Sequence, residues 1–142
     1  MTEARRVRDR YLAAFNDHDI SALLATFSPT GVVVRPEGTA EGPEEFASHI
    51  AEYWAAFPDC RLVVWEAFGA GETAVEEVSF AGTHTAPYLL PSGEVLAPTG
   101  RTVYVRGCNV STVEDGLVIS MRLYYDQLEL FSQLGVPCLP ST

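Results

Sequence analysis

Side chains that could transfer or hold a proton are dispersed along this 142-residue chain, each on a different expected element. His49 carries an imidazole, whose ordinary pKa of ~6.5 suits proton transfer at neutral pH. Asn109 carries an amide that can donate a hydrogen bond to an enolate oxygen. Asp126 follows Tyr124 and Tyr125 at the end of an expected strand, where a carboxylate at a pocket mouth could act as acid or base. We take His49, Asn109 and Asp126 as the candidate catalytic residues.

Each of these residues also has an explanation without chemistry. His49 could be a core histidine with a backbone partner, and Asn109 could hold two strands together, since an unsatisfied buried amide costs about 1–3 kcal/mol. The run from Asp126 to Glu129 has the pattern of a capping box, in which the aspartate accepts a hydrogen bond from the first turn of a helix. Capping accounts for Asp126 without a catalytic role.

Helical periodicity dominates the first part of the chain. Apolar residues spaced by three and four predict a first helix over residues 3–17, with its arginines on the other side. Asp19 is the expected N-cap of a second helix over residues 20–27. A β-branched strand over residues 32–35 precedes a third helix over residues 42–57. One face of that third helix is expected to carry Phe46, His49, Ile50, Tyr53 and Phe57.

The pattern then changes to strands, which we expect over residues 61–68, 73–83, 101–113 and 117–125. A hairpin turn at Glu114-Asp115-Gly116 joins the last two. The Pro- and Gly-rich residues 85–100 are expected to form a long loop, and Asp126 to begin a short terminal helix. Helices followed by a meander of antiparallel strands predict an α+β fold.

Strand alternation predicts which side chains share a face. Asn109 shares one with Val103, Val105, Gly107 and Ser111. On the last strand, Leu123 and Tyr125 share a face, and Asp126 lies on the opposite one. One of Glu76 and Glu77 must face inward.

Composition limits the possible partners. The net charge is −10, with nine arginines and no lysine, and the absence of a basic cluster argues against nucleic acid or a membrane surface as partner. The three cysteines, Cys60, Cys108 and Cys138, are expected to be reduced thiols, and the scattered histidines support no metal site and no cofactor. No apolar run is long enough for a membrane span and no signal peptide is evident, so we expect a single cytoplasmic domain over residues 1–142.

The order of elements and several short motifs resemble those of SnoaL-like polyketide cyclases. The motifs are Phe57-Pro-Asp59, Gly82-Thr-His84-Thr-Ala-Pro87, Thr99-Gly-Arg101, Asp126-Gln-Leu128 and Gln133-Leu-Gly135. The resemblance covers nearly the whole chain. It implies a curved antiparallel sheet wrapped around N-terminal helices to form a cone-shaped pocket, a short C-terminal helix, and a homodimer.

The resemblance also assigns places to individual residues. Tyr11 matches the oxyanion-binding tyrosine of ketosteroid isomerases, and Arg35 stands where those enzymes carry their proton-shuttling acid. In the similar anthracycline cyclases, a pocket asparagine matches His49, a pocket histidine matches Asn109, and the essential acid matches Leu123. A leucine cannot transfer a proton, so this chain does not use that carboxylate. The residues expected to contact substrate are Tyr11, Arg35, Tyr53, Trp54, His84, Tyr88, Leu123 and Tyr125.

By this resemblance, the expected function is cofactor-independent ring closure of a polyketide-type intermediate in secondary metabolism, on a hydrophobic small-molecule substrate. Two alternatives stay open. One is an epoxide hydrolase or epoxide-opening cyclase, for which Glu76 or Glu77 would have to replace a missing carboxylate. The other is a non-catalytic protein that binds a hydrophobic small molecule.

Overall fold

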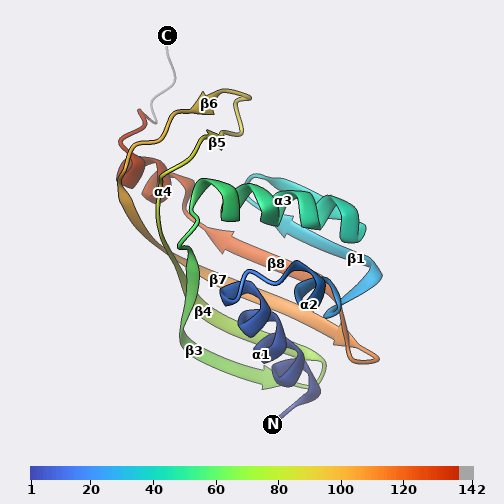
Figure 1. The fold of residues 1–142 in the computed structure, drawn as a ribbon. Helices are drawn as coiled ribbons and strands as arrows, with labels where there is room; N and C mark the ends of the chain where they lie inside the picture. The colour runs from blue at the N-terminus through green and yellow to red at the C-terminus, as the bar shows by residue number, and fades with distance from the viewer. Residues whose placement is uncertain (138–142) are drawn as a thin grey trace.

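The structure is a computed structural model that describes residues 1–137, and a curved six-stranded sheet forms its centre (Figure 1). The strands are β1 (Phe27–Arg35), β2 (Gly38–Glu41), β3 (Arg61–Ala70), β4 (Thr73–Thr83), β7 (Thr102–Glu114) and β8 (Leu117–Tyr125). They lie in the order β2-β1-β8-β7-β4-β3. All neighbours are antiparallel except β1 and β8, which run parallel, so the expected antiparallel sheet contains one parallel pair.

Two helices cover the concave face of this sheet. Helix α1 (Glu3–Asn16) packs over β3, β4 and β7, and α3 (Gly42–Ala56) packs over β1 (Figure 1). The short α2 (Ile20–Leu24) connects α1 to β1, and α4 (Gln127–Leu134) lies at the end of the sheet beside β7. This arrangement confirms the expected α+β fold, with a space between the helices and the sheet.

Local signals set most element boundaries. Asp19 caps α2 through a 3.1 Å hydrogen bond from the Ala22 amide. Asp115 and Gly116 have φ values of 52° and 76°, as a tight hairpin turn between β7 and β8 requires. Strands β4 and β8 have the expected bounds. Helix α2 ends at Leu24, before the expected residue 27, because Phe27 already belongs to β1.

The largest error in the sequence analysis concerns residues 27–41. We expected a strand over residues 32–35 only, whereas β1 begins at Phe27 and returns through a turn at Pro36-Glu37 into β2. Residues 38–41 have low β propensity, so local sequence gave no signal for the second strand. The expected loop 85–100 likewise contains a small hairpin, β5 (Tyr88–Leu89) and β6 (Val95–Leu96).

The expectation that the arginines of α1 face away from the core is wrong for Arg8. This side chain is 1% exposed and bonds Glu76 on β4, which is 0% exposed. Arg8 lies three residues before Tyr11 and therefore shares the inward face of the helix. Its burial depends on a carboxylate 68 positions away, which helical periodicity cannot reveal.

Cys60 and Cys108 are free thiols, and Cys138 lies outside the described residues. Within residues 1–137, no helix is long and apolar enough to cross a membrane.

Candidate active site

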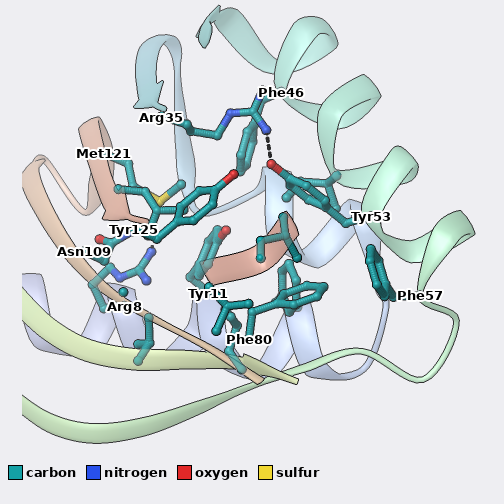
Figure 2. Close-up of a pocket in the computed structure, with 18 of the residues that line it drawn as sticks. Arg8, Tyr11, Arg35, Phe46, Tyr53, Phe57, Phe80, Asn109, Met121 and Tyr125 are labelled. Atoms are coloured by element: carbon teal, nitrogen blue, oxygen red, sulfur yellow. Dashed lines mark hydrogen bonds between the residues drawn. The ribbon is translucent and has the colours of Figure 1, made fainter. Parts of the chain in front are cut away.

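A cavity of about 100 Å³ lies between α1, α3 and the concave face of the sheet (Figure 2). Most of its wall is apolar, and the main contributors are Phe15, Phe46, Ile50, Phe57, Phe80 and Val105. Polar side chains line it at two places. One group comes from α1 and β7, and the other from β1, α3 and β8.

The first polar group contains a buried ion pair. Arg8 bonds Glu76 Oε1 through Nε at 3.0 Å and Nη2 at 2.7 Å, and its Nη1 lies 3.3 Å from the Met121 sulfur. Arg5 bonds the second oxygen of Glu76 at 2.7 Å. Arg8 lines the cavity. Glu76 does not line it, and the guanidinium groups of Arg5 and Arg8 hold its carboxylate. Glu76 is the inward member of the Glu76–Glu77 pair, and Glu77 is exposed.

Tyr11 presents its hydroxyl to the cavity (Figure 2). Burial raises its pKa to about 12, although the nearby Arg8 guanidinium, 4.1 Å from the ring centre, lowers it. The hydroxyl is therefore protonated at neutral pH and can donate a hydrogen bond to an oxyanion. Tyr11 thus lines the cavity, and its expected contact with substrate stays a prediction.

Asn109 lies across from Glu76 in the sheet register and is 4% exposed. Its Oδ1 accepts a 2.7 Å hydrogen bond from the Ser111 hydroxyl. No residue in the described part of the chain accepts a hydrogen bond from Nδ2, and Asn109 lines the cavity. The amide hydrogens are thus available to a ligand oxygen.

The second polar group, which we call the Glu37 cluster, consists of Arg35, Glu37, His49, Tyr53 and Tyr125. Arg35 donates to the Tyr53 hydroxyl (Figure 2), and Tyr53 donates to Glu37 Oε2. Tyr125 donates to the same oxygen at 2.5 Å, and the Arg35 guanidinium lies 3.7 Å from it. Arg35, Tyr53 and Tyr125 line the cavity, and Glu37 stands behind them.

His49 supports Arg35 from outside the cavity. Its Nδ1 lies 2.7 Å from Arg35 Nη2, and because a guanidinium only donates, Nδ1 must be the acceptor. Burial and the Arg35 charge lower the His49 pKa, which keeps the ring neutral with its proton on Nε2. His49 does not line the cavity. Its position fits a role in orienting Arg35.

Acidification is expected to destabilise the protein because folding lowers the pKa of two histidines, His49 and His84. In the unfolded chain a histidine titrates at ~6.5, whereas burial lowers the pKa of folded His49 and His84. Below about pH 6.5 the unfolded chain therefore binds more protons, and the free energy of unfolding falls. Urea unfolding at about pH 7, 6 and 5 measures this slope. The slope should flatten in His49→Gln, and an unchanged slope would contradict the neutral form of His49.

Asp126 lies outside the cavity and caps α4. It is exposed, and its Oδ1 accepts a 2.8 Å hydrogen bond from the Leu128 amide. The second half of the expected capping box is absent, since within residues 1–137 Glu129 pairs with Arg106 instead.

Replacing Asp126 by alanine is expected to lower the free energy of unfolding by about 1 kcal/mol, the usual effect of losing an N-cap. Because the carboxylate lines an open groove beside the cavity and not the cavity itself, affinity for a single-ring ligand confined to the cavity should stay within about twofold of wild type. Denaturant unfolding and ligand titration measure the two effects. A large loss of ligand binding at unchanged stability would restore Asp126 as a site residue.

Of three other residues expected to contact substrate, Tyr88 lines the cavity, and Trp54 and His84 do not. Tyr88, on β5, lines the cavity, and its burial raises its pKa. Trp54 does not line it, because its ring stacks on His18 at 4.9 Å and packs against Phe15. His84 is also outside: its Nδ1 accepts from the Thr99 amide at 3.1 Å, which ties together the two ends of the segment that carries β5 and β6.

Residues 9–121 match the SnoaL-like domain. The chain belongs to this family. No curated protein sequence matches the chain.

Solved structures of the SnoaL-like kind share the fold. A candidate SnoaL-like polyketide cyclase from Jannaschia sp. CCS1 is 23% identical, with 95% of this chain and 93% of that chain covered and a TM-score of 0.82. AclR, a candidate hydroxylase from Streptomyces galilaeus, is 22% identical, with 97% and 98% covered and a TM-score of 0.81. IdmH, a candidate polyketide cyclase from Streptomyces antibioticus, is 24% identical, with 95% and 100% covered and a TM-score of 0.80. At these identities the likeness establishes the fold.

Within this SnoaL-like chain, Leu123 lines the cavity and pairs with Asn109 in the sheet register. It occupies the inward face of β8 together with Met121 and Tyr125, as strand alternation predicted. An apolar side chain therefore stands at the place where the resemblance implied an essential acid.

Arg8 and Glu37 belong to the site although neither was predicted as a site residue. A strand end followed by Pro36-Glu37-Gly38 is a turn signal, and it could have marked Glu37 as a residue held near the sheet rim. The signal for Arg8 was its spacing of three from Tyr11. Neither signal identifies the partner of the charged group.

Proposed function

We propose that this protein is a cofactor-independent cyclase that closes a ring in a polyketide-type intermediate. The observation that carries the proposal is an apolar, largely aromatic cavity with hydrogen-bond donors from Tyr11 and Asn109 at one place and Arg35 at another. Such a cavity can fold a flexible chain and stabilise an oxyanion that forms during ring closure. The names of two structural relatives, both candidate polyketide cyclases, support the substrate class.

The charges at the site favour an uncharged substrate. Glu76 is paired with Arg8 and Arg5, and Glu37 lies beside Arg35, so each carboxylate has a cationic neighbour. A ligand with hydroxyl and carbonyl groups can use the available polar atoms without adding a buried charge, which would be costly.

The size of the cavity limits what can enter it. A cavity of about 150 Å³ holds benzene, so the present volume of about 100 Å³ admits at most one six-membered ring. An open groove of about 570 Å³, lined by Leu90, Phe131 and Tyr125 among others, lies next to the cavity, and Tyr125 borders both. We expect the closing ring to occupy the cavity and the rest of a longer substrate to extend along this groove.

Ring closure would be an isomerisation. The cavity excludes water and brings the two reacting carbons together, which lowers the entropic part of the barrier. Tyr11 and Asn109 would donate hydrogen bonds to the oxygen on which negative charge develops. Arg35, oriented by His49, would hold a second oxygen.

Epoxide opening is less well supported. That reaction needs a carboxylate that can activate water or a hydroxyl, and the inward-facing Glu76 is bonded by two arginines. Three hydrogen bonds from those arginines occupy most of its acceptor sites, and Glu76 does not line the cavity.

Incubation of purified protein with linear polyketide-type intermediates tests the function. We expect a product of unchanged mass and altered chromatographic retention, formed by wild type and by the matched variant Tyr124→Phe, whose side chain is 59% exposed. Binding without any product would instead favour a non-catalytic binding protein. Added water in the product mass would favour epoxide hydrolysis.

We also propose a cytoplasmic homodimer. Trp65, Phe68, Tyr104 and Tyr124 are exposed aromatic side chains on β3, β7 and β8, and Tyr104 alternates with the buried Val103 and Val105. Exposed aromatic groups of this kind favour pairing of two copies. Light scattering distinguishes one copy from two.

A further inference from the structure

The Glu37 carboxylate sits behind two tyrosine hydroxyls that face the cavity. Its Oε2 accepts hydrogen bonds from Tyr53 and Tyr125. Its Oε1 is buried and has no hydrogen-bond partner within residues 1–137. The Glu37 side chain is 12% exposed and Arg35 6% exposed, so the cluster is largely shielded from solvent.

The direction of these hydrogen bonds determines what the cluster can bind. A tyrosine that donates its proton to a carboxylate keeps its oxygen lone pairs for another donor. Arg35 already uses one lone pair of Tyr53. In the described part of the chain no group donates to Tyr125, whose side chain borders both the cavity and the groove. Tyr125 therefore offers an acceptor to a hydroxyl on the ligand.

We propose that Tyr125, backed by Glu37 and Tyr53, binds an enolic or phenolic hydroxyl of the ligand and relays its proton to Glu37. The role of this site in turnover rests on the proposed cyclase function. The binding of a ligand hydroxyl at Tyr125 does not depend on that function. Glu37 would supply the carboxylate that is absent at Leu123. The ligand class is a ring or pre-ring segment with an enol or phenol group.

The proton balance is simple. The ligand hydroxyl gives its proton to the Tyr125 oxygen while the Tyr125 proton passes to Glu37 Oε2. The electron pair left on the ligand oxygen forms a carbonyl, and the enol carbon attacks the acceptor carbon of the same molecule. The acceptor oxygen, now negative, takes back one proton through the hydroxyls, which restores the Glu37 carboxylate. No atom or electron is gained or lost.

The surroundings suit such a relay. Burial, then the Glu37 charge, raises the pKa of both Tyr53 and Tyr125, so both remain hydroxyls at neutral pH. The charged or titratable groups around Glu37 are Arg35 on β1, His49 and Tyr53 on α3, Tyr88 on β5 and Tyr125 on β8. Glu52 on α3 also raises the pKa of both His49 and Tyr88. Arg35 is the one fixed cation in this set, and it lies beside one fixed carboxylate. A bound phenolate would meet the Glu37 charge, so the ligand should bind as the neutral phenol.

Binding of 4-nitrophenol tests the inference without turnover. This single-ring probe ionises near neutral pH, and its phenolate absorbs at a longer wavelength than the phenol. Wild type is expected to bind the neutral form and to raise the apparent pKa of the bound probe. Glu37→Gln removes the negative charge and leaves Arg35 unbalanced, so the bound probe should ionise at least about one pH unit lower than in wild type.

A variant of Tyr125 and a probe without a hydroxyl test the contact between Tyr125 and the ligand hydroxyl separately. Tyr125→Phe should weaken 4-nitrophenol binding by about tenfold, roughly the value of one hydrogen bond to a buried group, and Tyr124→Phe should not. The probe 4-nitroanisole, which has no hydroxyl, should bind wild type about tenfold more weakly than 4-nitrophenol and be insensitive to Tyr125→Phe. If circular dichroism shows that Glu37→Gln is unfolded, the Tyr125→Phe variant and the 4-nitroanisole probe still test the hydroxyl contact.

The relay is overturned if the bound probe ionises equally in wild type and Glu37→Gln, or if the anisole binds as tightly as the phenol. If product formation is observed, Glu37→Gln should also lower kcat far more than it raises KM, a split that a purely structural role would not produce. Probe binding as expected without any product would refute the cyclase proposal and leave the hydroxyl site standing.

Discussion

Replacing Arg8 by alanine is expected to lower the free energy of unfolding by about 3–5 kcal/mol, the largest effect we predict for a single side chain. The reason is that Glu76 is 0% exposed and would lose two of its hydrogen bonds while remaining buried. Arg5 would still contact its other oxygen. Urea unfolding followed by circular dichroism measures the change.

The double variant Arg8→Met/Glu76→Leu provides the matched comparison. In the double variant Arg5 loses Glu76 but keeps its 2.6 Å ion pair with Asp9. Replacement of a buried pair by apolar groups of similar size is often neutral or stabilising. We expect the double variant to recover most of the loss. Arg6→Ala, at an exposed position of the same helix, should change stability by less than about 0.5 kcal/mol. A loss below about 1 kcal/mol for Arg8→Ala would mean that the ion pair is not buried as described.

The second large effect concerns turnover. Asn109→Leu and Tyr11→Phe are each expected to reduce kcat by about 10²–10³, as loss of one oxyanion-binding donor does in other enzymes, with little change in KM. Both changes keep the approximate shape of the side chain and remove a donor that faces the cavity. Product formation at saturating substrate, followed by chromatography, measures kcat.

The controls for this prediction address packing. Asn109→Leu leaves the Ser111 hydroxyl without its acceptor, so the comparison is made with Asn109→Leu/Ser111→Ala, which should be equally slow but more stable. Tyr124→Phe should keep wild-type kcat. If Asn109→Leu and Tyr11→Phe both turn over at the wild-type rate, the oxyanion is stabilised elsewhere, and Arg35 becomes the principal candidate.

Much of the framework could be predicted from local patterns. Alternation on β7 and β8 placed Asn109, Leu123 and Tyr125 on the face that lines the cavity, and Asp126 on the other side. Alternation and helical spacing depend on the backbone geometry of one element at a time, so one sequence is sufficient to read them.

Local patterns were less informative for the charged groups. Spacing put His49 on the Phe46–Tyr53 face of α3, yet His49 contacts Arg35 outside the cavity. A residue at the edge of an apolar face can turn either toward the cavity or toward a neighbouring strand, and the position of that strand decides.

The sequence by itself determined the α+β class, the inward faces of β7 and β8, the cap at Asp126, and an apolar residue at Leu123. Only the tertiary structure decided that Arg8 and Glu76 are buried together and that Glu37 joins Tyr53 and Tyr125, which are 16 and 88 positions away. Charged groups are stable inside a protein only with a partner at hydrogen-bonding distance. That distance is set by how separate elements pack, so residue type and local spacing cannot supply it.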